Sequence, residues 1–415
     1  MITRKDAEAL DAKDPLAGFR DRFALPPGVI YLDGNSLGVL PKGVAERVSG
    51  TIADEWGRDL IASWNKAGWI ALPLSVGDMI APLIGADAGD VVVGDSTSVN
   101  LFKCLSAALM AQSVRTGPGR KVIVTEAENF PTDNYIIQGA AKLLDAEIRY
   151  TAPGQSPIPL IDGQTAVVLL THVNYRTAAM YDMAAITKAA HDNGALMIWD
   201  LSHSTGAVPL DLKACNVDFA VGCSYKYLNG GPGAPAFTYA LKRIAQSLTQ
   251  PLSGWMGHKN PFAFSLDYEP GEAIKRFLCG TPQVLSLAAL QAALTLWRDV
   301  DLAALRAKSL SLTSLFMDLV AQECGDFGLE AVTPRDPARR GSHVSLRFEH
   351  GYPVMRAMAD HGVVGDFRAP DLMRFGFTPL YISHAETYEA VQRLKTVLES
   401  NAWREEKYQT RLAVT

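Results

Sequence analysis

The sequence predicts an α/β protein in which a mostly parallel sheet of the seven-stranded type forms a large domain, and a smaller α+β domain follows at the C-terminal end. Three observations predict this fold class. From Asp90 onward short apolar runs alternate with helical patterns, reactive polar side chains follow the ends of these runs, and the alternation stops near residue 300. Strands that alternate with helices form parallel sheets covered on both faces.

The N-terminal part precedes this alternation. Residues 1–30 read as a polar helical arm, and VIYLDGNSLGVLP after it predicts a short strand followed by a turn. Asn35 and Ser36 of the turn are able to contact a ligand. An Asp-Gly-Asn turn is also common without any ligand, so the residues alone leave both interpretations open.

Five apolar runs form the predicted sheet. In chain order they are VVVG, VIVT, VVLLTHV, ALMIW and FAVGC. Helical patterns begin at Leu101, Asn134 and Met183, after the first three runs. GGPG at Gly230–Gly233 and the APAFTYA that follows predict a turn into a further strand, for which an antiparallel direction is one option.

Two segments on either side of these units are less regular. Residues 44–65 have helical spacing and carry Trp56 and Trp64, a pair that on one helix fills a core more often than a site. Residues 250–282 contain several prolines and glycines together with aromatic side chains. Loops of that length in a compact protein tend to be functional or to lie at an interface.

A long helical pattern separates the two domains. Residues 285–324 are almost continuously helical, and SHVSLRF, a short helix, VVGDFRAPDLMRFGF and a final helix follow. We therefore expect an N-terminal arm of residues 1–50, a large domain of residues 51–300 and a small domain of residues 301–415.

Composition narrows the function class. The 415 residues are 48% hydrophobic and 20% charged, and the net charge of −5 lacks the basic excess of a nucleic-acid binder. Five cysteines without CxxC spacing indicate neither a disulfide framework nor a zinc site. The first residues lack the apolar segment of a secretory signal, and no apolar stretch reaches the roughly 18 residues of a membrane helix. We expect a cytoplasmic enzyme with no nucleic-acid or membrane partner.

A carboxylate and an amine follow two of the apolar runs. Asp200 comes directly after ALMIW, and Tyr225 and Lys226 come just after FAVGC. Because ligands bind at the carboxyl ends of the strands in an α/β sheet, these groups should face one crevice. Lysine condenses with an aldehyde, and a carboxylate keeps a pyridine nitrogen protonated, so the pair predicts pyridoxal phosphate.

Other strand ends carry groups that suit the same cofactor. Thr97 and Ser98 lie where a helix N-terminus would bind a phosphate, although both residues also serve as simple caps. In NFPTD, Phe130 would lie on the cofactor ring while Thr132 and Asp133 bond at its edge.

Three further side chains, Thr171, His172 and His203, have two possible interpretations. Thr171 or His172 would touch the ring, but His172 is equally explained as a core histidine. His203 would orient Asp200 or reach the phosphate.

No GxGxxG opens a helix, no GxSxG marks a nucleophile elbow and no HExxH or metal-ligand cluster is present, so dinucleotide, serine-hydrolase and metal chemistry are not indicated.

Several stretches together resemble the kynureninase family, and specifically its bacterial type. They are YLDGNSLG (31–38), NFPTD (129–133), IWDLSHSTGAVP (198–209), GCSYKYLNGGPG (222–233), PLSGWMGH (251–258), FLCGTP (277–282), RRGSHVSL (339–346) and MRFGFTPLY (373–381). The general class-V aminotransferase pattern would give the aspartate, histidine and lysine alone, whereas YLDGNSLG and RFGFTPLY belong to this family.

The resemblance implies a fold-type-I pyridoxal-phosphate enzyme and a homodimer with active sites at the subunit interface. By it, Lys226 bonds covalently to the cofactor, Asp200 pairs with the pyridine nitrogen and Phe130 stacks on the ring beside Asp133. The other cofactor contacts that it implies, mostly at the phosphate, are Thr97, Ser98, His203 and Tyr225, with Trp255 and Thr281 from the partner subunit.

The resemblance also implies a substrate and a reaction. Arg374 would bind the α-carboxylate of L-kynurenine, and Trp64, Gly280 and Thr281 would line the pocket for its aryl ring, which favours kynurenine over the 3-hydroxy derivative. The reaction is hydrolysis to anthranilate and L-alanine in tryptophan catabolism, with Lys226 as base. Tyr225 is a candidate proton donor.

Two alternatives remain at this stage. A cysteine desulfurase or selenocysteine lyase on the same scaffold would require a mobile nucleophilic cysteine, for which Cys279 is the candidate. A catalytically silent binder on this fold would be expected to lack Lys226 or Arg374, and both residues are present.

Overall fold

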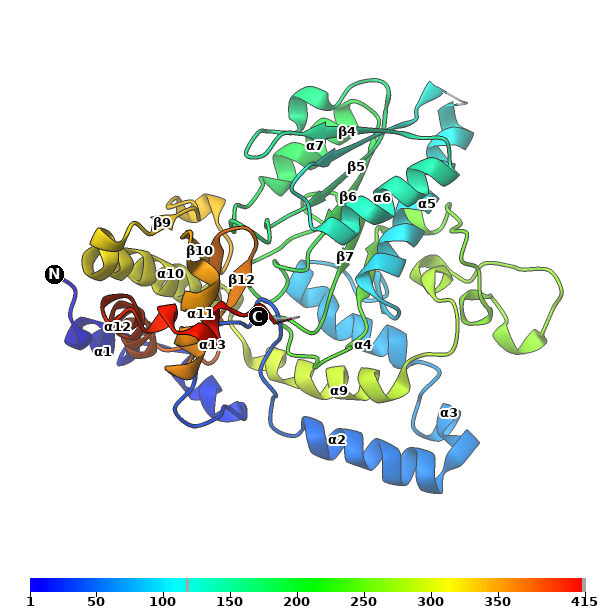
Figure 1. The fold of residues 1–415 in the computed structure, drawn as a ribbon. Helices are drawn as coiled ribbons and strands as arrows, with labels where there is room; N and C mark the ends of the chain where they lie inside the picture. Colours follow the sequence, from blue (N-terminus) through cyan, green and yellow to red (C-terminus); the bar gives the residue numbers. More distant parts are fainter. Residues whose placement is uncertain (117–118, 413–415) are drawn as a thin grey trace.

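A seven-stranded sheet forms the centre of the large domain (Figure 1). The computed structural model describes residues 1–116 and 119–412. The strand order is β2-β8-β7-β6-β5-β3-β4. The bounds are β2 (Val91–Val93), β3 (Val122–Glu126), β4 (Glu147–Thr151), β5 (Thr165–Thr171), β6 (Leu196–Asp200), β7 (Phe219–Gly222) and β8 (Phe237–Ala240). β8 runs antiparallel to both of its neighbours, β2 and β7, and the other strand pairs of this sheet are parallel, which confirms the predicted α/β class and the antiparallel option for the strand after GGPG.

Helices cover both faces of this sheet. In β6, Ile198 packs in the apolar cluster that includes α5 and α6, whereas Met197 and Trp199 pack in the cluster that includes α7. This alternation follows from the two-residue period of a strand. The large-domain helices are α2 (Val44–Gly50), α3 (Ser63–Lys66), α4 (Leu72–Ile80), α5 (Thr97–Thr116), α6 (Pro131–Leu143), α7 (Met183–Asp192), α8 (Lys242–Ala245) and α9 (Val284–Leu294).

Several predicted boundaries were wrong. Strand β4 was not predicted, because its sequence EIRYT is an edge strand with polar side chains and no apolar run. Helix α6 begins three residues before the predicted start, since Pro131 at its first position has a φ preset for a helix. The prediction that residues 285–324 are almost continuously helical was right, with a break only at Val300 and Asp301, where the Asp301 side chain caps α10 by accepting from the backbone of Ala303 and Ala304.

The predicted helix 44–65 was also too simple. Residues Val44–Gly50 are α-helical, but Thr51–Arg58 form a π-helical segment and the chain then turns before Ser63. Trp56 points into solvent and is 57% exposed, so its expected place in a core was wrong.

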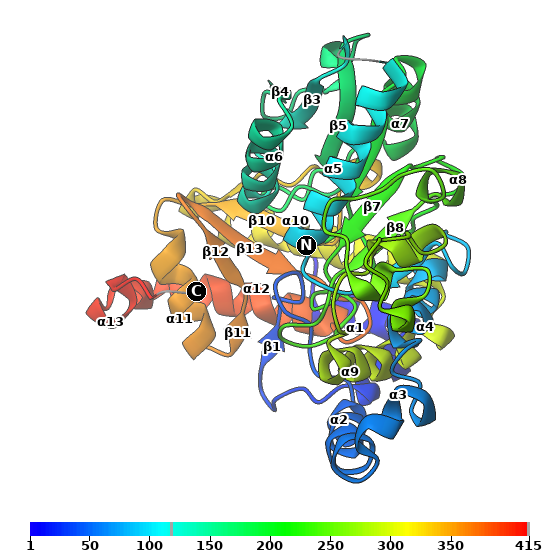
Figure 2. The ribbon, with the colours of Figure 1, turned by 90° about the vertical axis from the view of Figure 1, so that its right-hand side faces the viewer.

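A second, four-stranded antiparallel sheet forms the small domain (Figure 2). Its order is β12-β13-β10-β9. The strands are β9 (Glu330–Ala331), β10 (His343–Arg347), β12 (Asp366–Arg368) and β13 (Leu372–Gly376), and the helices are α10 (Leu302–Cys324), α11 (Gly351–Asp360), α12 (His384–Glu399) and α13 (Glu406–Gln409). Within the two described ranges, no helix is both long enough and apolar enough to cross a bilayer.

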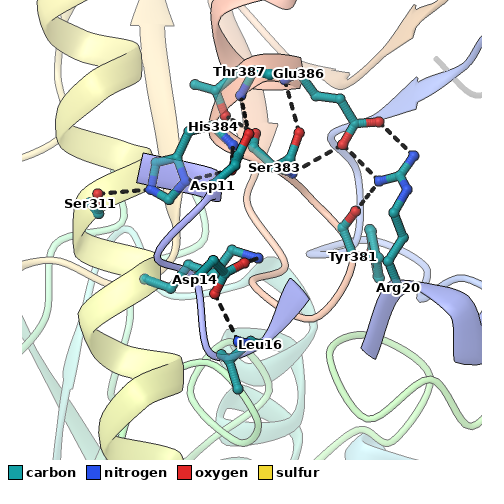
Figure 3. Close-up of polar contacts among 12 residues, drawn as sticks. Asp11, Asp14, Leu16, Arg20, Ser311, Tyr381, Ser383, His384, Glu386 and Thr387 are labelled. Atoms are coloured by element: carbon teal, nitrogen blue, oxygen red, sulfur yellow. Dashed lines mark hydrogen bonds and ion pairs between the residues drawn. The ribbon is translucent and has the colours of Figure 1, made fainter. Parts of the chain in front are cut away.

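The first part of the N-terminal arm packs against the small domain, and the arm also contacts the large domain, where the Asn229 amide donates to the Val39 carbonyl oxygen at 3.0 Å. Helix α1 (Arg4–Asp11) packs beside α12 in both views (Figures 1 and 2). The Asp11 carboxylate accepts from the backbone N–H groups of His384 and Ala385, and Arg20 bonds to Glu386 (Figure 3). These contacts make the arm and α12 one packed unit.

Candidate active site

A cavity of about 650 Å³ opens at the carboxyl ends of the central strands. Its walls come from the ends of β6 and β7, the N-terminus of α5 and the loop before α6. The lining residues are Asp95, Ser96, Thr97, Ser98, Phe130, Thr132, Asp133, Asp200, Ser202, His203, Cys223, Tyr225, Lys226, Gly233, Ala234, Ala236 and Gln283. Most side chains predicted for the cofactor therefore meet in one place.

Asp200 is fixed at the end of β6. It is 3% exposed, and its Oδ1 accepts from the backbone N–H of Ser202 at 2.8 Å and from the Ser202 hydroxyl at 2.6 Å. Strand pairing places Thr171 opposite Asp200 in the adjacent strand β5. The carboxylate is thus held at the cavity wall by its own turn.

A second carboxyl group lies against Asp200. Asp133, in the first turn of α6, is 2% exposed, and its pKa is raised well above the usual value by burial, by the charge of Asp200 and by a hydrogen bond with Asp200. Thr171 donates its hydroxyl to the Asn129 side chain and lies 3.4 Å from Asp133. Because two buried carboxylates cannot both ionise readily, Asp133 keeps its proton beside Asp200.

Lys226 projects into the same cavity from the loop after β7. Its Nζ lies 3.2 Å from Nε2 of His203 and 5.9 Å from the centre of the Phe130 ring. Burial and the nearby Lys226 hold the pKa of His203 well below its usual value, so this histidine is neutral. His203 therefore lies beside the lysine and makes no hydrogen bond to Asp200 among the described contacts.

His172 proves to be a core residue. Its ring bonds to the Ser204 hydroxyl at 2.9 Å and packs against Trp199 with ring centres 5.7 Å apart. Burial lowers the pKa of His172 to about 4. Of the two interpretations open from the sequence, the core histidine is the one found.

The pKa of Tyr225 is raised, so its phenol stays protonated. The adjacent Cys223 thiol, burial and the charge of Asp200 all raise the pKa of Tyr225 above its usual value. A neutral phenol at the wall of a cavity can donate a hydrogen bond or a proton but does not act as a base at neutral pH.

The N-terminus of α5 lies against the cavity through the loop Asp95–Ser98. Buried Lys103 anchors this loop, since its Nζ donates to the Asp95 carboxylate at 2.5 Å and to the Phe277 carbonyl oxygen at 2.6 Å. The hydroxyls of Thr97 and Ser98 and the free N–H groups of a helix start make a suitable cradle for an anion.

The predicted substrate residues Asn35, Ser36 and Arg374 also meet, although they are far apart in the sequence. Strand β1 (Ile30–Tyr31) pairs with β11 (Val363–Val364), and the turn after β1 runs beside β13. Ser36 lies 2.9 Å from Nη2 of Arg374. Gly376 permits this approach, because a Cβ there would lie 1.8 Å from Asn35 Oδ1.

The turn 33–38 also contacts the loop after β7 that carries Lys226. The backbone N–H of Gly38 donates to the carbonyl oxygen of Tyr225 at 2.8 Å, and a Cβ at Gly38 would lie 2.3 Å from the carbonyl oxygen of Lys226. The turn 33–38 therefore joins the Lys226 cavity to the small-domain arginine.

Four predicted site residues lie elsewhere. Trp64 and Trp255 pack edge to face at 5.8 Å and line a separate apolar cavity of about 760 Å³ that shares no lining residue with the Lys226 cavity. Gly280 and Thr281 are exposed and line neither cavity, although Gln283, two residues further on, lines the Lys226 cavity.

Sequence reasoning missed several residues near the site. Asp366 pairs with Arg374 in the register of β12 and β13, and Arg368 shares the same carboxylate. Their spacing in DFR, with alternate residues on one strand face, was a usable signal. His343 is fully buried beside His203, with both ring nitrogens lacking a partner among the described residues.

Comparisons with known proteins place this geometry in a family. A sequence profile described as Kynureninase C-terminal domain matches residues 305–394, and one for the DegT/DnrJ/EryC1/StrS aminotransferase family matches residues 96–225. The kynureninase of Pseudomonas fluorescens is 52% identical and that of Burkholderia pseudomallei strain 1106a 50% identical, each over 100% of both chains. The chain belongs to the kynureninase family.

Solved structures show the wider fold of this kynureninase-family chain. A cysteine desulfurase from Thermococcus onnurineus has a TM-score of 0.78 at 18% identity and covers 92% of this chain and 98% of its own. A C-DES mutant with glycine linked to its pyridoxal-phosphate cofactor has a TM-score of 0.78 at 16% identity, covering 91% and 98%. At such identities the likeness shows only the fold, which is the pyridoxal-phosphate fold type I.

The donor set of the cavity fits this cofactor. Lys226 offers an amine for the aldehyde, Asp200 a buried carboxylate for the ring nitrogen, and Phe130 an aromatic face. The hydroxyls of Thr97 and Ser98 and the N-terminus of α5 are suited to bind the phosphate. The kynureninase-family chain is accordingly a pyridoxal-phosphate enzyme.

Proposed function

We propose that this protein hydrolyses L-kynurenine to anthranilate and L-alanine. One observation carries the proposal: in a chain that kynureninases match over its full length, the turn 33–38 joins the Lys226 cavity to Arg374. An amine at the cofactor and a guanidinium beyond it are the two groups that an α-amino acid substrate requires. The five free cysteines fit a reducing, cytoplasmic location.

The residues of the Lys226 cavity divide the chemical work. Bound pyridoxal phosphate supplies an aldehyde for the substrate amine and a ring that accepts electrons from the α-carbon. Lys226 would remove the α-proton of a substrate bound at the cofactor, and its Nζ lies 3.2 Å from Nε2 of His203, which is neutral. Asp200 keeps the ring nitrogen protonated, while Asp133 stays neutral.

The overall reaction consumes one water. Its oxygen ends on the aryl carbonyl carbon to give anthranilate, the bond between the β- and γ-carbons breaks, and a proton ends on the β-carbon to give L-alanine. Tyr225 is the proton donor in this proposal, since its raised pKa keeps the phenol protonated.

The phosphate and the aryl ring are proposed to be bound by two copies of the chain. Thr97, Ser98, His203 and Tyr225 serve one copy's phosphate site. The second copy contributes Trp64, Trp255, Gly280 and Thr281, none of which lines its own Lys226 cavity. Exposed apolar side chains around that group, Ile61 at 79% and Phe264 at 80%, support a homodimer that covers them.

The second copy's group also sets the substrate preference that we propose. Its aromatic lining, Trp64 with Trp255, suits an aryl ring without a 3-hydroxyl group. An apolar pocket rejects an added hydroxyl only modestly, so we expect lower but measurable activity on 3-hydroxykynurenine.

A cysteine desulfurase is the alternative reaction on this fold. It would require Cys279 to swing over the cofactor as a nucleophile. The Cys279 thiol instead bonds to the Leu252 carbonyl oxygen at 2.8 Å, and its backbone packs against Gly254, where a Cβ would lie 2.3 Å from the Cys279 carbonyl oxygen. This segment is packed, which favours kynurenine hydrolysis.

Anthranilate fluorescence after addition of kynurenine tests the proposal. Wild type should release anthranilate and alanine in equal amounts, Arg374→Ala should lose most of this activity, and Lys226→Ala should lose it along with the visible absorbance of the bound cofactor. Sulfide release from cysteine without anthranilate from kynurenine would contradict the proposal.

A further inference from the structure

The loop 174–179, which follows β5, is held in shape by a buried asparagine. Asn174 is 7% exposed, and its Oδ1 accepts from the backbone N–H of Arg176 at 2.9 Å. Its Nδ2 donates to the Glu128 carbonyl oxygen at 3.3 Å, two residues before Phe130. An asparagine that bonds to the backbone two residues ahead of it fixes a turn. The loop is therefore bound to the segment that carries Phe130.

The other side of this loop is bound to the small-domain sheet. The Tyr175 carbonyl oxygen accepts from Nη1 of Arg374 on β13 at 2.6 Å, and the Arg176 carbonyl oxygen accepts from the Ser345 hydroxyl on β10. Arg374 is 1% exposed and Ser345 is fully buried, so little water competes for these bonds. The backbone of Tyr175 therefore has a fixed position relative to Arg374.

The Tyr175 ring packs against the Phe130 ring. The ring centres lie 5.2 Å apart and the ring planes make an angle of 89°, an edge-to-face arrangement that aromatic pairs prefer. Phe130 lines the Lys226 cavity and is 40% exposed. Exposed side chains change rotamer rapidly unless a neighbour restrains them. Tyr175 is such a neighbour for the ring that the cavity offers to the cofactor.

One residue thus contacts two parts of the site through different atoms. The Tyr175 ring meets Phe130 of the large domain, and its carbonyl oxygen meets Arg374 of the small domain. An α-amino acid has a single bond between its α-carbon and its carboxylate carbon, so it cannot adapt to a change in the spacing of cofactor and guanidinium. A misplacement of about 1 Å in such a site can cost on the order of 100-fold in rate.

We propose that Tyr175 is a positioning residue that fixes the orientation of the Phe130 ring, and with it the plane of the bound cofactor ring, relative to Arg374. Tyr175 is not among the residues that line the Lys226 cavity, so it acts through Phe130. The inference rests on the proposed function only in taking Arg374 to bind the substrate carboxylate.

A double-mutant cycle on cofactor binding tests the contact with Phe130. Titration of the apoenzyme with pyridoxal phosphate gives a dissociation constant for wild type, Tyr175→Leu, Phe130→Leu and the double variant. Tyr175→Leu should weaken cofactor binding by about 2- to 10-fold, the range for one aromatic pair. It should add nothing in the Phe130→Leu background, because the ring that it holds is then absent. Tyr175→Met repeats the cycle if the leucine variant does not fold.

Two further readouts separate positioning from a general loss of structure. The visible circular dichroism of the bound cofactor should change in Tyr175→Leu and stay as in wild type in Tyr175→Phe, which keeps the ring. At saturating cofactor, kcat for kynurenine should fall about tenfold in Tyr175→Leu and be unchanged in Tyr175→Phe. The matched control is Tyr135→Leu, since Tyr135 lies on α6 and is 64% exposed. It should equal wild type in all three measurements.

Three outcomes would overturn the role of Tyr175. They are equal weakening of cofactor binding by Tyr175→Leu with and without Phe130, an unchanged circular dichroism spectrum in Tyr175→Leu, and a wild-type kcat in that variant at saturating cofactor. If wild type binds the cofactor but releases no anthranilate from kynurenine, the proposed reaction fails. The cycle and the circular dichroism then still decide the role of Tyr175.

Discussion

Asp33 gives the candidate site a pH dependence that can be derived from its surroundings. Its carboxyl group has a pKa of about 7 because burial and Asp366 oppose ionisation, while Ser36, Arg374 and Arg368 only partly offset them. The other titratable groups within electrostatic reach of Asp33 are Tyr31, Tyr227 and Tyr381, whose pKa values are raised by burial, so they stay neutral. Asp33 is thus the group of this set that changes charge near neutral pH.

The first prediction follows from that titration. Arg374 and Arg368 share the single Asp366 carboxylate, which leaves one excess positive charge while Asp33 is protonated. Above pH 7 Asp33 is ionised and this excess charge disappears, so the KM for kynurenine should rise between pH 6 and pH 8 by on the order of fivefold. Asp33→Asn should remove this rise, and the ratio of variant to wild-type KM cancels titration of the substrate amine. An identical pH profile in the variant would refute the prediction. The same raised pKa means that the free energy of unfolding falls as pH rises from 3.8 towards about 7.

Lys103 gives a second prediction at this scale. It is 1% exposed and holds the loop at the start of α5 to the Phe277 carbonyl oxygen, so its loss leaves Asp95 and a buried carbonyl without their donor. Lys103→Met should lower the free energy of unfolding by about 2 kcal/mol and weaken cofactor retention. Thermal melting and dialysis followed by absorbance measure both effects. Lys213→Met, which breaks an exposed pair with Asp87, should change neither.

At the scale of elements, the N-terminal arm acts as part of the small domain. Asp11 caps α12 and also bonds to the His384 ring at 2.8 Å, whose other nitrogen lies 2.9 Å from Ser311 on α10 (Figure 3). Lys308 and Asp14 form a buried ion pair at 2.6 Å nearby. The arm thereby joins α12 to α10, and it carries the turn 33–38 to the site.

Loss of that cap is therefore expected to loosen the small domain. Asp11→Ala removes an acceptor from two helix N–H groups and should lower the free energy of unfolding by about 1–2 kcal/mol, measured by denaturant titration. Glu8→Ala on the same helix breaks only an exposed pair with Arg4 and should change stability by less than about 0.5 kcal/mol. Equal effects of the two substitutions would show that the cap contributes nothing.

The positions of site residues at strand ends were predictable from the sequence, whereas contacts between residues on different small-domain strands were not. Asp200 and Lys226 follow buried apolar runs, so their common place at one sheet edge follows from strand direction alone. The edge strand β4 lacks an apolar run and gave no signal. The pairing of Asp366 with Arg374 depends on the register of two small-domain strands, which hydrophobic pattern does not specify for short segments.

For the whole molecule, the distribution of site residues over two cavities is the main consequence of the fold. Helix α5 and the ends of β6 and β7 form the Lys226 cavity, whereas Trp64 and Trp255 line a different cavity and Thr281 lines neither. A cyclic dimer uses the same patch of both copies, so each copy would complete the site of the other. This arrangement predicts complementation between inactive variants.

The variant Lys226→Ala lacks the amine in its own site. A second variant with both Trp255→Ala and Thr281→Ala keeps its own Lys226 but lacks the two side chains that it would contribute to the site of its partner. Each variant alone should be inactive. After subunit exchange about half of the dimers are mixed, and in each of these one site has an intact Lys226 and receives intact Trp255 and Thr281, so about a quarter of wild-type activity should return. Exchange is verified by two affinity tags. Mixed dimers without recovered anthranilate release would show that each chain builds its site alone, and that the apolar surface at Ile61 and Phe264 serves another purpose.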